Sequence, residues 1–439
     1  MNLGWLRFCL WMLAYITLAL VPMAIALLGE VPALRTRMVE AGAMLGLLGL
    51  GVLSAQAVVS GRQRWFARGL GQDDLLQFHR QTGLFALLLV FAHPLTLFLA
   101  DARYLAFLDP RVDALRAVSL SFVLVAIVAL IASSLWRLRF GLSYERWRLL
   151  HGGLALAIVG LGLGHALMVG HYTDPLWKKA LLVAAVGGAL WLMLETRLRR
   201  PWRARRRPWR IAAIEPGRGE AWTLQLRPEG HDGLRFRPGQ FAWLSLGDSP
   251  WQLQQHPFSM ASGADDDTVA FTIKAAGDFT GSLEHREPGG RAWLEGPYGV
   301  FTYLPGQSPA GAVFIAGGVG ITPFLSILRT AHDRGAREPL WLLYANQRWD
   351  EVIFRDELEQ LARTLPLTLV HVLGEPHEGW SGETGYIDAE LLDRHLPEAV
   401  ADMPCYVCGP EAMADSVEPL LIARGVPAKN LYSERFDMV

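Results

Sequence analysis

The feature that most limits the fold is a series of uncharged, apolar stretches in the first half of the chain. A helix needs about 20 residues to cross the hydrocarbon core of a bilayer. Five stretches reach that length: Phe8–Gly29, Ala41–Ser60, Gln81–Ala100, Ala117–Trp136 and Leu149–Gly170. A sixth, Ala180–Leu194, is shorter, but Lys178 and Lys179 can extend it by snorkelling. The sequence therefore predicts a six-helix transmembrane bundle over residues 1–200, followed by a half with the composition of a soluble protein.

Basic residues are unevenly distributed between the two ends of these predicted helices. One end holds Arg7, Arg62, Arg64, Arg68, Arg80, Arg137, Arg139, Arg146, Arg148 and the arginines between Arg197 and Arg210. The other end holds Arg35, Arg37, Arg103, Arg111, Arg116, Lys178 and Lys179. Because basic residues favour the cytoplasmic side, we expect a multi-pass protein of the cell (inner) membrane with its N-terminus and soluble half in the cytoplasm. The Arg197–Arg210 cluster adjoins an apolar stretch, so it can bind anionic membrane lipid or simply mark the cytoplasmic side, and nucleic acid is a poor explanation for it.

The three cysteines are Cys9, Cys405 and Cys408. This number excludes a disulfide framework and an iron–sulfur cluster held by four thiolates of the chain. Cys405-Tyr-Val-Cys408 has the spacing of a redox dithiol, but it closes a predicted strand within a nucleotide-binding pattern. We therefore favour a structural role for this pair.

Four histidines lie within the apolar stretches. His79 and His93 belong to the third predicted helix, and His151 and His165 to the fifth, each pair 14 residues apart. In a helix this spacing corresponds to a rise of about 21 Å and to faces within about 40° of each other. Both helices run in the same direction, so His79 and His151 are expected at one depth and His93 and His165 at another. His171 has no counterpart and is expected in an interfacial loop.

Two imidazoles that face each other across a bundle can fill both axial positions of a haem iron. The alternative is that an intramembrane histidine bonds a neighbouring helix or belongs to a proton path. The repeated spacing favours two haems stacked across the membrane, with His79, His93, His151 and His165 as metal ligands. Arg80, Arg146 and Arg148 are candidates to pair with haem propionates at the inner end, and Arg103 at the outer end; each is otherwise a solvated charge.

Short strands separated by Gly, Pro and Asp follow the apolar half. The clearest are Trp222–Leu226, Phe241–Leu246, Thr268–Ala275 and Arg291–Glu295. This pattern predicts a small antiparallel β-barrel over residues 207–305. In His256-Pro-Phe-Ser259 an aromatic ring and a hydroxyl stand together, as flavin binding requires. Gly277-Asp-Phe-Thr-Gly-Ser282 opens a predicted helix that can hold a pyrophosphate, and Lys274 is a further cofactor-binding candidate.

The last part, residues 310–439, alternates strand and helix as a parallel sheet requires. The strand Ala312–Ala316 leads into the turn Gly317-Gly-Val-Gly320, with Thr322 as the expected N-cap and Pro323 as the first helical residue. A glycine turn between a strand and a helix lets a phosphate approach the backbone. This predicts an α/β Rossmann-like nucleotide-binding domain.

The strand Leu340–Ala345 ends in Asn346-Gln-Arg348, where we identify no acid placed for a ribose 2′-hydroxyl. Arg348 can instead pair with a 2′-phosphate, which favours NADPH, with NADH still possible. The alternative is that Arg348 is an exposed loop residue.

Over nearly its whole length the chain resembles the ferric reductase and NADPH oxidase superfamily in its compact prokaryotic form. The likeness rests on the paired histidines and on HPFS at 256–259, GDFTGS at 277–282, GPYG at 296–299, GGVGITP at 317–323, CGP at 408–410 and ERF at 434–436. It implies a ferredoxin-reductase type of soluble half, with a flavin site and a nucleotide site. The flavin site comprises His256, Pro257, Phe258, Ser259, Gly281 and Ser282. The nucleotide site comprises Gly317, Gly318, Gly320, Thr322, Pro323, Cys408, Gly409 and Pro410. Phe436 would cover the flavin face, and Phe436 and Cys408 are the catalytic candidates.

The activity that this resemblance implies is that of an NAD(P)H oxidase or ferric reductase-type oxidoreductase. FAD can accept an electron pair and release single electrons to two b-type haems. We expect dioxygen as the acceptor, giving superoxide, before a ferric chelate or a membrane quinone, and we expect no requirement for partner proteins. Two rivals are a membrane-anchored flavin reductase without haem and a transporter with a sensor domain, whose histidines serve protons or metal.

Overall fold

The computed structural model describes residues 3–60 and 72–436. Arg62, Arg64 and Arg68, which contribute to the predicted charge bias, lie outside the described residues, and so does the segment 437–439. The chain forms two compact units, Met1–Arg199 and Arg200–Val439. Each unit is described by itself below.

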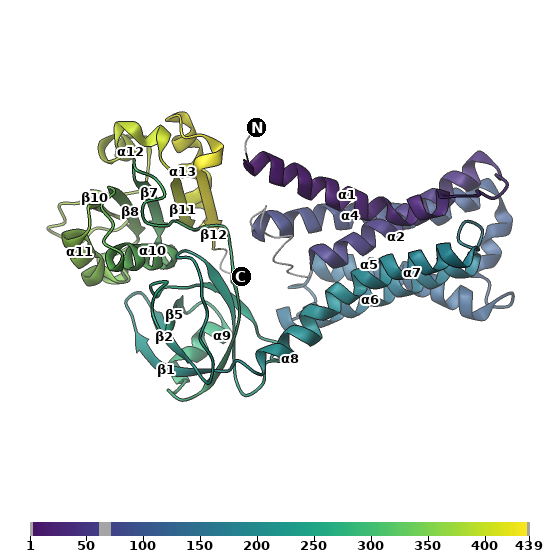
Figure 1. The fold of residues 1–439 in the computed structure, drawn as a ribbon, viewed down its shortest axis with the longest axis horizontal. Helices are drawn as coiled ribbons and strands as arrows, with labels where there is room; N and C mark the ends of the chain where they lie inside the picture. The colour runs from purple at the N-terminus through teal and green to yellow at the C-terminus, as the bar shows by residue number, and fades with distance from the viewer. Residues whose placement is uncertain (1–2, 61–71, 437–439) are drawn as a thin grey trace. The chain divides into compact units, whose positions relative to one another are not determined.

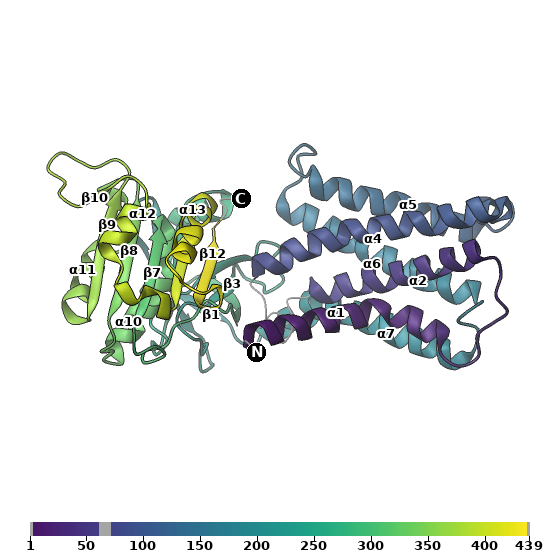
Figure 2. The same cartoon turned by 90° about the horizontal axis from the view of Figure 1, so that it is seen from above.

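The first unit is a bundle of long helices that lie side by side (Figures 1 and 2). Within the described residues, six helices are long and apolar enough to cross a membrane, which confirms the predicted bundle. They are α1 (Leu3–Leu27), α2 (Arg37–Val59), α4 (Gln72–Ala100), α5 (Ala114–Leu135), α6 (Tyr144–Val169) and α7 (Leu176–Leu194). Large apolar side chains such as Leu88 and Val125 point outward, as lipid-facing positions require.

Lys178 does not snorkel to the interface as predicted. Lys178 is only 1% exposed, and its ammonium group donates to the carbonyl oxygens of Ala26 at 2.9 Å and Glu30 at 3.1 Å. These carbonyls lie at the C-terminal end of α1, where a positive charge satisfies unpaired acceptors and opposes the helix dipole. The contact links α7 to α1, and α7 begins at Leu176 rather than at Ala180.

The second unit begins with the short helix α8 (Arg200–Ala204) and a six-stranded antiparallel sheet of order β4-β3-β6-β1-β2-β5. Its strands are β1 (Trp209–Pro216), β2 (Ala221–Pro228), β3 (Phe241–Leu246), β4 (His256–Ser259), β5 (Val269–Lys274) and β6 (Arg291–Tyr298). An antiparallel bridge from Met260 to Phe271 brings the two edges of the sheet together. The predicted antiparallel barrel is therefore confirmed as a curled sheet around buried residues such as Leu224 and Leu244.

The second sheet is parallel and has the order β10-β9-β8-β7-β11-β12. Its strands are β7 (Ala312–Gly317), β8 (Leu340–Asn346), β9 (Leu367–Leu373), β10 (Glu383–Thr384), β11 (Cys405–Gly409) and β12 (Leu431–Arg435). Alternate residues of β7 face two cores: Phe314 packs in the core with α10 (Thr322–Asp333) and α11 (Arg355–Thr364), and Ile315 in the core with α12 (Ala389–His395) and α13 (Glu411–Ala423). Figure 1 shows this helix-covered sheet. The α/β prediction is confirmed.

Candidate functional site

The four intramembrane histidines form two facing pairs. The imidazole centroids of His79 and His151 lie 6.2 Å apart at an interplanar angle of 61°, and those of His93 and His165 lie 6.3 Å apart at 65°. We call His79 and His151 the proximal pair, because they lie toward the end of the bundle at which the chain leaves α7, and His93 and His165 the distal pair. The structure therefore pairs one histidine of α4 with one of α6 at each depth, as predicted.

The separation within each pair fits a metal held between two imidazoles. An imidazole nitrogen lies about 2.0–2.1 Å from a metal that it binds and about 1.2 Å from the centre of its own ring. Two rings on opposite sides of one iron therefore have centroids about 6.4 Å apart. Both pairs match this value, so the residues present fit a haem with two histidine ligands at each level.

The proton on His93 is fixed by a contact that the sequence does not reveal. The Nδ1 atom of His93 lies 2.7 Å from the carbonyl oxygen of Gly42 on α2. Because a carbonyl only accepts, Nδ1 must carry the proton, which leaves Nε2 with the lone pair that a metal needs. Space for the ring comes from Gly46, where a Cβ atom would lie 2.7 Å from the same Nδ1.

His151 is oriented in a similar way. Its Nδ1 atom lies 3.2 Å from the hydroxyl oxygen of Ser134 on α5, and that hydroxyl donates to the carbonyl oxygen of Leu130 at 2.7 Å. The Ser134 proton is thus already used, so Nδ1 of His151 is the donor in their contact. His79, its partner, has a buried Nδ1 without a hydrogen-bond partner among the described residues.

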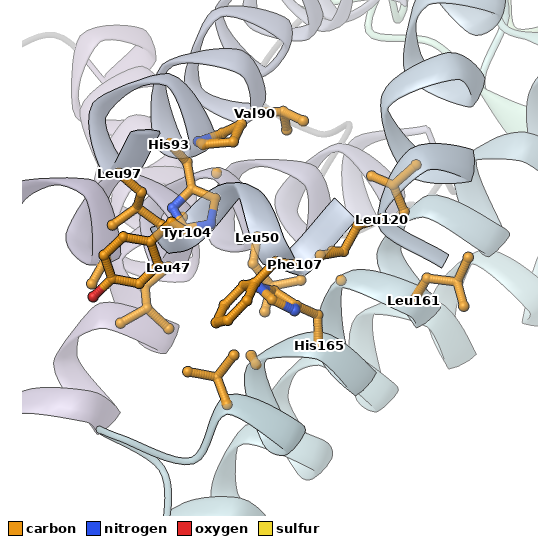
Figure 3. Close-up of a pocket in the computed structure, with 18 of the residues that line it drawn as sticks. Leu47, Leu50, Val90, His93, Leu97, Tyr104, Phe107, Leu120, Leu161 and His165 are labelled. Atoms are coloured by element: carbon orange, nitrogen blue, oxygen red, sulfur yellow. The ribbon is translucent and has the colours of Figure 1, made fainter. Parts of the chain in front are cut away.

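The distal pair borders a cavity of about 240 Å³. Figure 3 shows His93 and His165 projecting into it from α4 and α6. Apart from these rings the wall is mostly aliphatic and aromatic, including Leu50, Tyr104 and Phe107. Within residues 3–60 and 72–436 there is no cluster of three or more His, Cys, Asp or Glu side chains able to hold a bare metal ion. A haem needs two protein ligands only.

The basic residues predicted to meet propionates differ in burial. Arg148, one turn before His151 on α6, is 8% exposed, whereas Arg80 and Arg146 are exposed. Arg148 is therefore the best placed of these three for an anion inside the bundle.

In the second unit, the HPFS segment forms β4, paired with β3. Ser259 is 4% exposed, and its hydroxyl has no hydrogen-bond partner within the described part of the chain. The His256 ring lies 4.3 Å, centroid to centroid, from that of Phe279, and Phe258 stacks beside Phe279. A buried hydroxyl in need of a partner next to an aromatic surface suits a flavin ring, which offers both polar edges and an apolar face.

The GDFTGS segment forms a shorter helix than expected. The turn α9 (Asp278–Gly281) is continued by a 3₁₀ turn, Ser282–His285. The backbone amides of Ala276 and Gly277 donate to the hydroxyl of Thr280, and the hydroxyl of Ser282 donates to the Phe279 carbonyl. These amides and hydroxyls are therefore already engaged within the segment. Lys274 ends β5 and is half-buried.

The glycine turn lies against the end of β11. A Cβ atom at Gly320 would lie 2.2 Å from the carbonyl oxygen of Cys408, and one at Gly317 would lie 2.8 Å from the sulfur of Met413. Gly318 instead has a φ of +54° and open space around its missing Cβ. Two glycines therefore permit close packing, while Gly318 is where a nucleotide can approach the backbone.

Thr322 does not cap the following helix as predicted. A 3₁₀ turn, Gly318–Ile321, runs directly into α10, so Thr322 is the first helical residue and its hydroxyl donates to the Val319 carbonyl. Pro323 lies within the first turn of the helix, close to the predicted position. Behind the turn, the Tyr344 hydroxyl donates to the carbonyl of Gly318 at 3.1 Å.

The cysteine pair lies inside the nucleotide domain. Cys405 and Cys408 are fully buried in β11 and are not joined in a disulfide, and burial raises the pKa of the Cys405 thiol to about 12. Gly409 ends β11, and Pro410 directly precedes α13. Phe436 is half-buried, and its backbone amide donates to the Gly409 carbonyl at 3.0 Å, so the end of the described chain lies beside the glycine turn.

Arg348 is surrounded by acids that follow it in the chain. Its guanidinium pairs with Asp350 at 3.4 Å and with Glu351 at 3.1 Å, and its side chain is 54% exposed. Two carboxylates therefore share this arginine. A 2′-phosphate would have to compete with two carboxylates for this arginine, which weakens the argument for NADPH over NADH.

Sequence reasoning missed Gly42, Gly46 and Ser134, which orient the histidines, and Phe279, which packs on His256. The signal for the first two was present as small residues four apart on α2, a spacing typical of close helix packing. Ser134 carries no such signal.

Gly320→Ala tests the close approach at the nucleotide site. Because the new Cβ would overlap the Cys408 carbonyl, we expect the turn to shift and kcat/KM for NAD(P)H-dependent ferricyanide reduction to fall by more than about tenfold, equal to about 1.4 kcal/mol. Absorbance of bound FAD checks the fold. Gly335→Asn, at a φ of +62° with open space, is the control and should keep the wild-type rate. Wild-type kinetics in Gly320→Ala would show that the packing is not needed.

Three family models match consecutive parts of the chain. They are the ferric reductase like transmembrane component over residues 45–162, an FAD-binding domain over 220–302 and an oxidoreductase NAD-binding domain over 314–419.

Known proteins resemble about half of the chain. Ferredoxin–NADP reductase B of Sorangium cellulosum (strain So ce56) is 34% identical over 239 residues, which are 52% of this chain and 96% of that protein. NADH-cytochrome b5 reductase 1 of Lodderomyces elongisporus is 34% identical over 166 residues, 37% of this chain and 55% of that protein. Among solved structures, the flavohem-like FAD/NAD-binding domain of nitric oxide dioxygenase from Vibrio cholerae O1 biovar El Tor is 22% identical and covers 52% of this chain and 98% of that one, with a TM-score of 0.47.

Proposed function

We propose that this chain, which belongs to the ferric reductase and NADPH oxidase-like proteins, carries electrons from a reduced nicotinamide nucleotide through FAD and two haems to an acceptor on the far side of a membrane. That it is a membrane flavoprotein oxidoreductase using NAD(P)H follows from its three matched domains. The two haems, the direction of transfer and the acceptor are the parts that we propose. The arginine bias of the sequence supports a cytoplasmic soluble half in a multi-pass protein of the cell membrane.

The observation that carries the proposal is the geometry of the two histidine pairs. Two independent pairs have the same centroid separation within 0.1 Å, 6.2 and 6.3 Å, and that separation suits an iron between them. In each pair, one histidine also has an acceptor for its Nδ1 proton, Gly42 for His93 and Ser134 for His151. Histidines that only bonded neighbouring helices would have no reason to face each other at this distance twice.

FAD supplies the conversion of a hydride's electron pair into single electrons, which haem irons then carry one at a time. The chain's own part is to bind and orient. Ser259 offers a buried hydroxyl to the flavin edge, and the open side of Gly318 receives the nucleotide. Gly42 and Ser134 hold Nδ1 protonated, which would leave the Nε2 lone pairs of His93 and His151 for a metal.

The acceptor that we favour is dioxygen, giving superoxide. If His93 and His165 both bound the iron, no coordination position would remain for an acceptor, which would have to be reduced without binding the metal. Dioxygen is small and uncharged, so it can approach through the apolar residues around the distal pair more readily than a charged chelate can. A ferric chelate is the second candidate, because the matched transmembrane family is named for that activity.

Replacement of single histidines tests the haem assignment. We expect two b-type haems per purified wild-type chain by the pyridine haemochrome method, and about one in His93→Leu or in His79→Leu, with FAD retained in both. The control is His377→Leu, which replaces an exposed histidine of the second unit and should keep two haems. A wild-type protein that contains flavin alone would contradict the proposal and favour the membrane-anchored flavin reductase.

Gly46→Ala tests the distal pair more gently. The added Cβ would lie within 3 Å of the His93 ring and push it from its place, so we expect loss or weakening of the distal haem alone. The readout is the haem content together with the reduced-minus-oxidised spectrum. Gly160→Ala on α6 meets nothing within 4 Å and is the matched control. Equal haem content and spectra in both variants would show that α2 does not fix His93.

An assay with purified protein and NADPH separates the two acceptors. We expect reduction of cytochrome c that superoxide dismutase abolishes, and we expect His93→Leu to lower this rate at least about tenfold, because transfer would stop at the proximal level. Ferrous chelate formation without dismutase-sensitive reduction would instead make ferric iron the acceptor. An unchanged rate of NADPH consumption in His93→Leu would contradict transmembrane transfer altogether.

A further inference from the structure

The arginine predicted to pair with an outer haem propionate is exposed and already has a carboxylate partner. Arg103 has a side chain that is 92% exposed, and its guanidinium pairs with Asp101 at 2.7 Å. Its Nε donates to the same carboxylate at 2.8 Å. Arg103 does not line the cavity beside the distal pair. An anionic group reaching out of that cavity would have to find another partner.

Arg116 does not line the cavity either, but it lies next to residues that do. It is in the first turn of α5, and Leu120, Val123 and Leu124, which follow it at helical spacing, all line the cavity. Its guanidinium carbon lies 4.3 Å above the centre of the Phe107 ring. Phe107 also lines the cavity, and Figure 3 shows it there with Leu120 and His165.

The charge of Arg116 is only weakly compensated by its neighbour. Its side chain is 24% exposed, and its Nε, which is buried, has no hydrogen-bond partner in the described part of the chain. The nearest carboxylate, Asp113, lies 3.6 Å from Nε, beyond hydrogen-bonding distance, because Asp113 accepts from the backbone amide of Arg116 at 3.0 Å to cap α5. The guanidinium thus retains donors for a second anion.

The arginine that does line this cavity is already neutralised. Arg35 lines the cavity, but its Nε donates to Glu40 at 2.9 Å and a second guanidinium nitrogen reaches the other carboxylate oxygen at 3.4 Å. Tyr172 donates its hydroxyl to the same carboxylate. Arg35 and Glu40 therefore form a closed pair, whereas Arg116 is paired loosely.

We infer that Arg116 binds a carboxylate inside the bundle, and that this carboxylate is a propionate of the distal haem. A guanidinium is suited to this role because it can donate two parallel hydrogen bonds to one carboxylate, and stacking on Phe107 fixes its plane. A positive charge beside the haem favours the reduced iron, which carries one positive charge fewer. Arg116 is therefore a positioning residue that raises the reduction potential of the distal haem. The inference rests on the proposed function, since it requires a haem between His93 and His165.

The test is a spectroelectrochemical titration of the purified full-length protein without any acceptor. In Arg116→Gln we expect the potential of the distal haem to become more negative, or that haem alone to be lost, with the proximal haem and FAD retained. Arg116→Lys, which keeps the charge, should restore part of the shift. Arg103→Gln is the matched control and should titrate like the wild type. The His93→Leu protein should keep the proximal haem only, so its titration identifies which potential belongs to which haem.

The outcomes separate this inference from the proposed function. If Arg116→Gln keeps two haems with unchanged potentials, the inferred role of Arg116 is wrong, whereas the proposed function still stands. If that variant keeps both potentials but raises the KM for ferric citrate, the carboxylate belongs to the acceptor and the haem assignment of Arg116 is wrong. A wild-type protein without haem overturns the proposed function and this inference together.

Discussion

In the bundle, the imidazoles of α4 and α6 stand face to face at two levels, and the proposed electron path depends on this arrangement. Apolar helices gain little from contacting each other in lipid, because the lipid tails are as apolar as their side chains. Specific contacts must therefore fix which helices face each other. Two shared irons would supply such contacts between α4 and α6, and the 6.2 and 6.3 Å separations are already those that shared irons need.

The neighbouring helices prepare this arrangement. On α2, Gly46 leaves room for the His93 ring, and the Gly42 carbonyl fixes its proton. On α5, Ser134 does the same for His151. At the opposite end of the bundle from α7's exit, Lys178 closes the open carbonyls of α1. Each contact places a polar group where lipid offers no partner, so each one selects a single packing of the helices.

Much of this could be predicted from the sequence, because the relevant patterns are local. Apolar length gave the six spans, equal spacing placed four histidines at two depths, and the strand, glycine turn and helix around Gly318 were read from adjacent residues. What failed depends on partners far along the chain. Gly42 lies 51 residues from His93, and Lys178 lies 152 residues from Ala26. The predicted N-cap position of Thr322 was wrong by one residue, because a 3₁₀ turn continues directly into α10. Residue preferences at a helix start do not reveal such a turn.

Electron paramagnetic resonance of the oxidised, purified protein is the most direct test of the face-to-face imidazoles. An iron with a histidine on each side is low-spin, so the account predicts low-spin ferric signals from two haems, with the distal set missing from His93→Leu. High-spin haem signals, or no haem iron at all in a protein that retains its flavin, would contradict it.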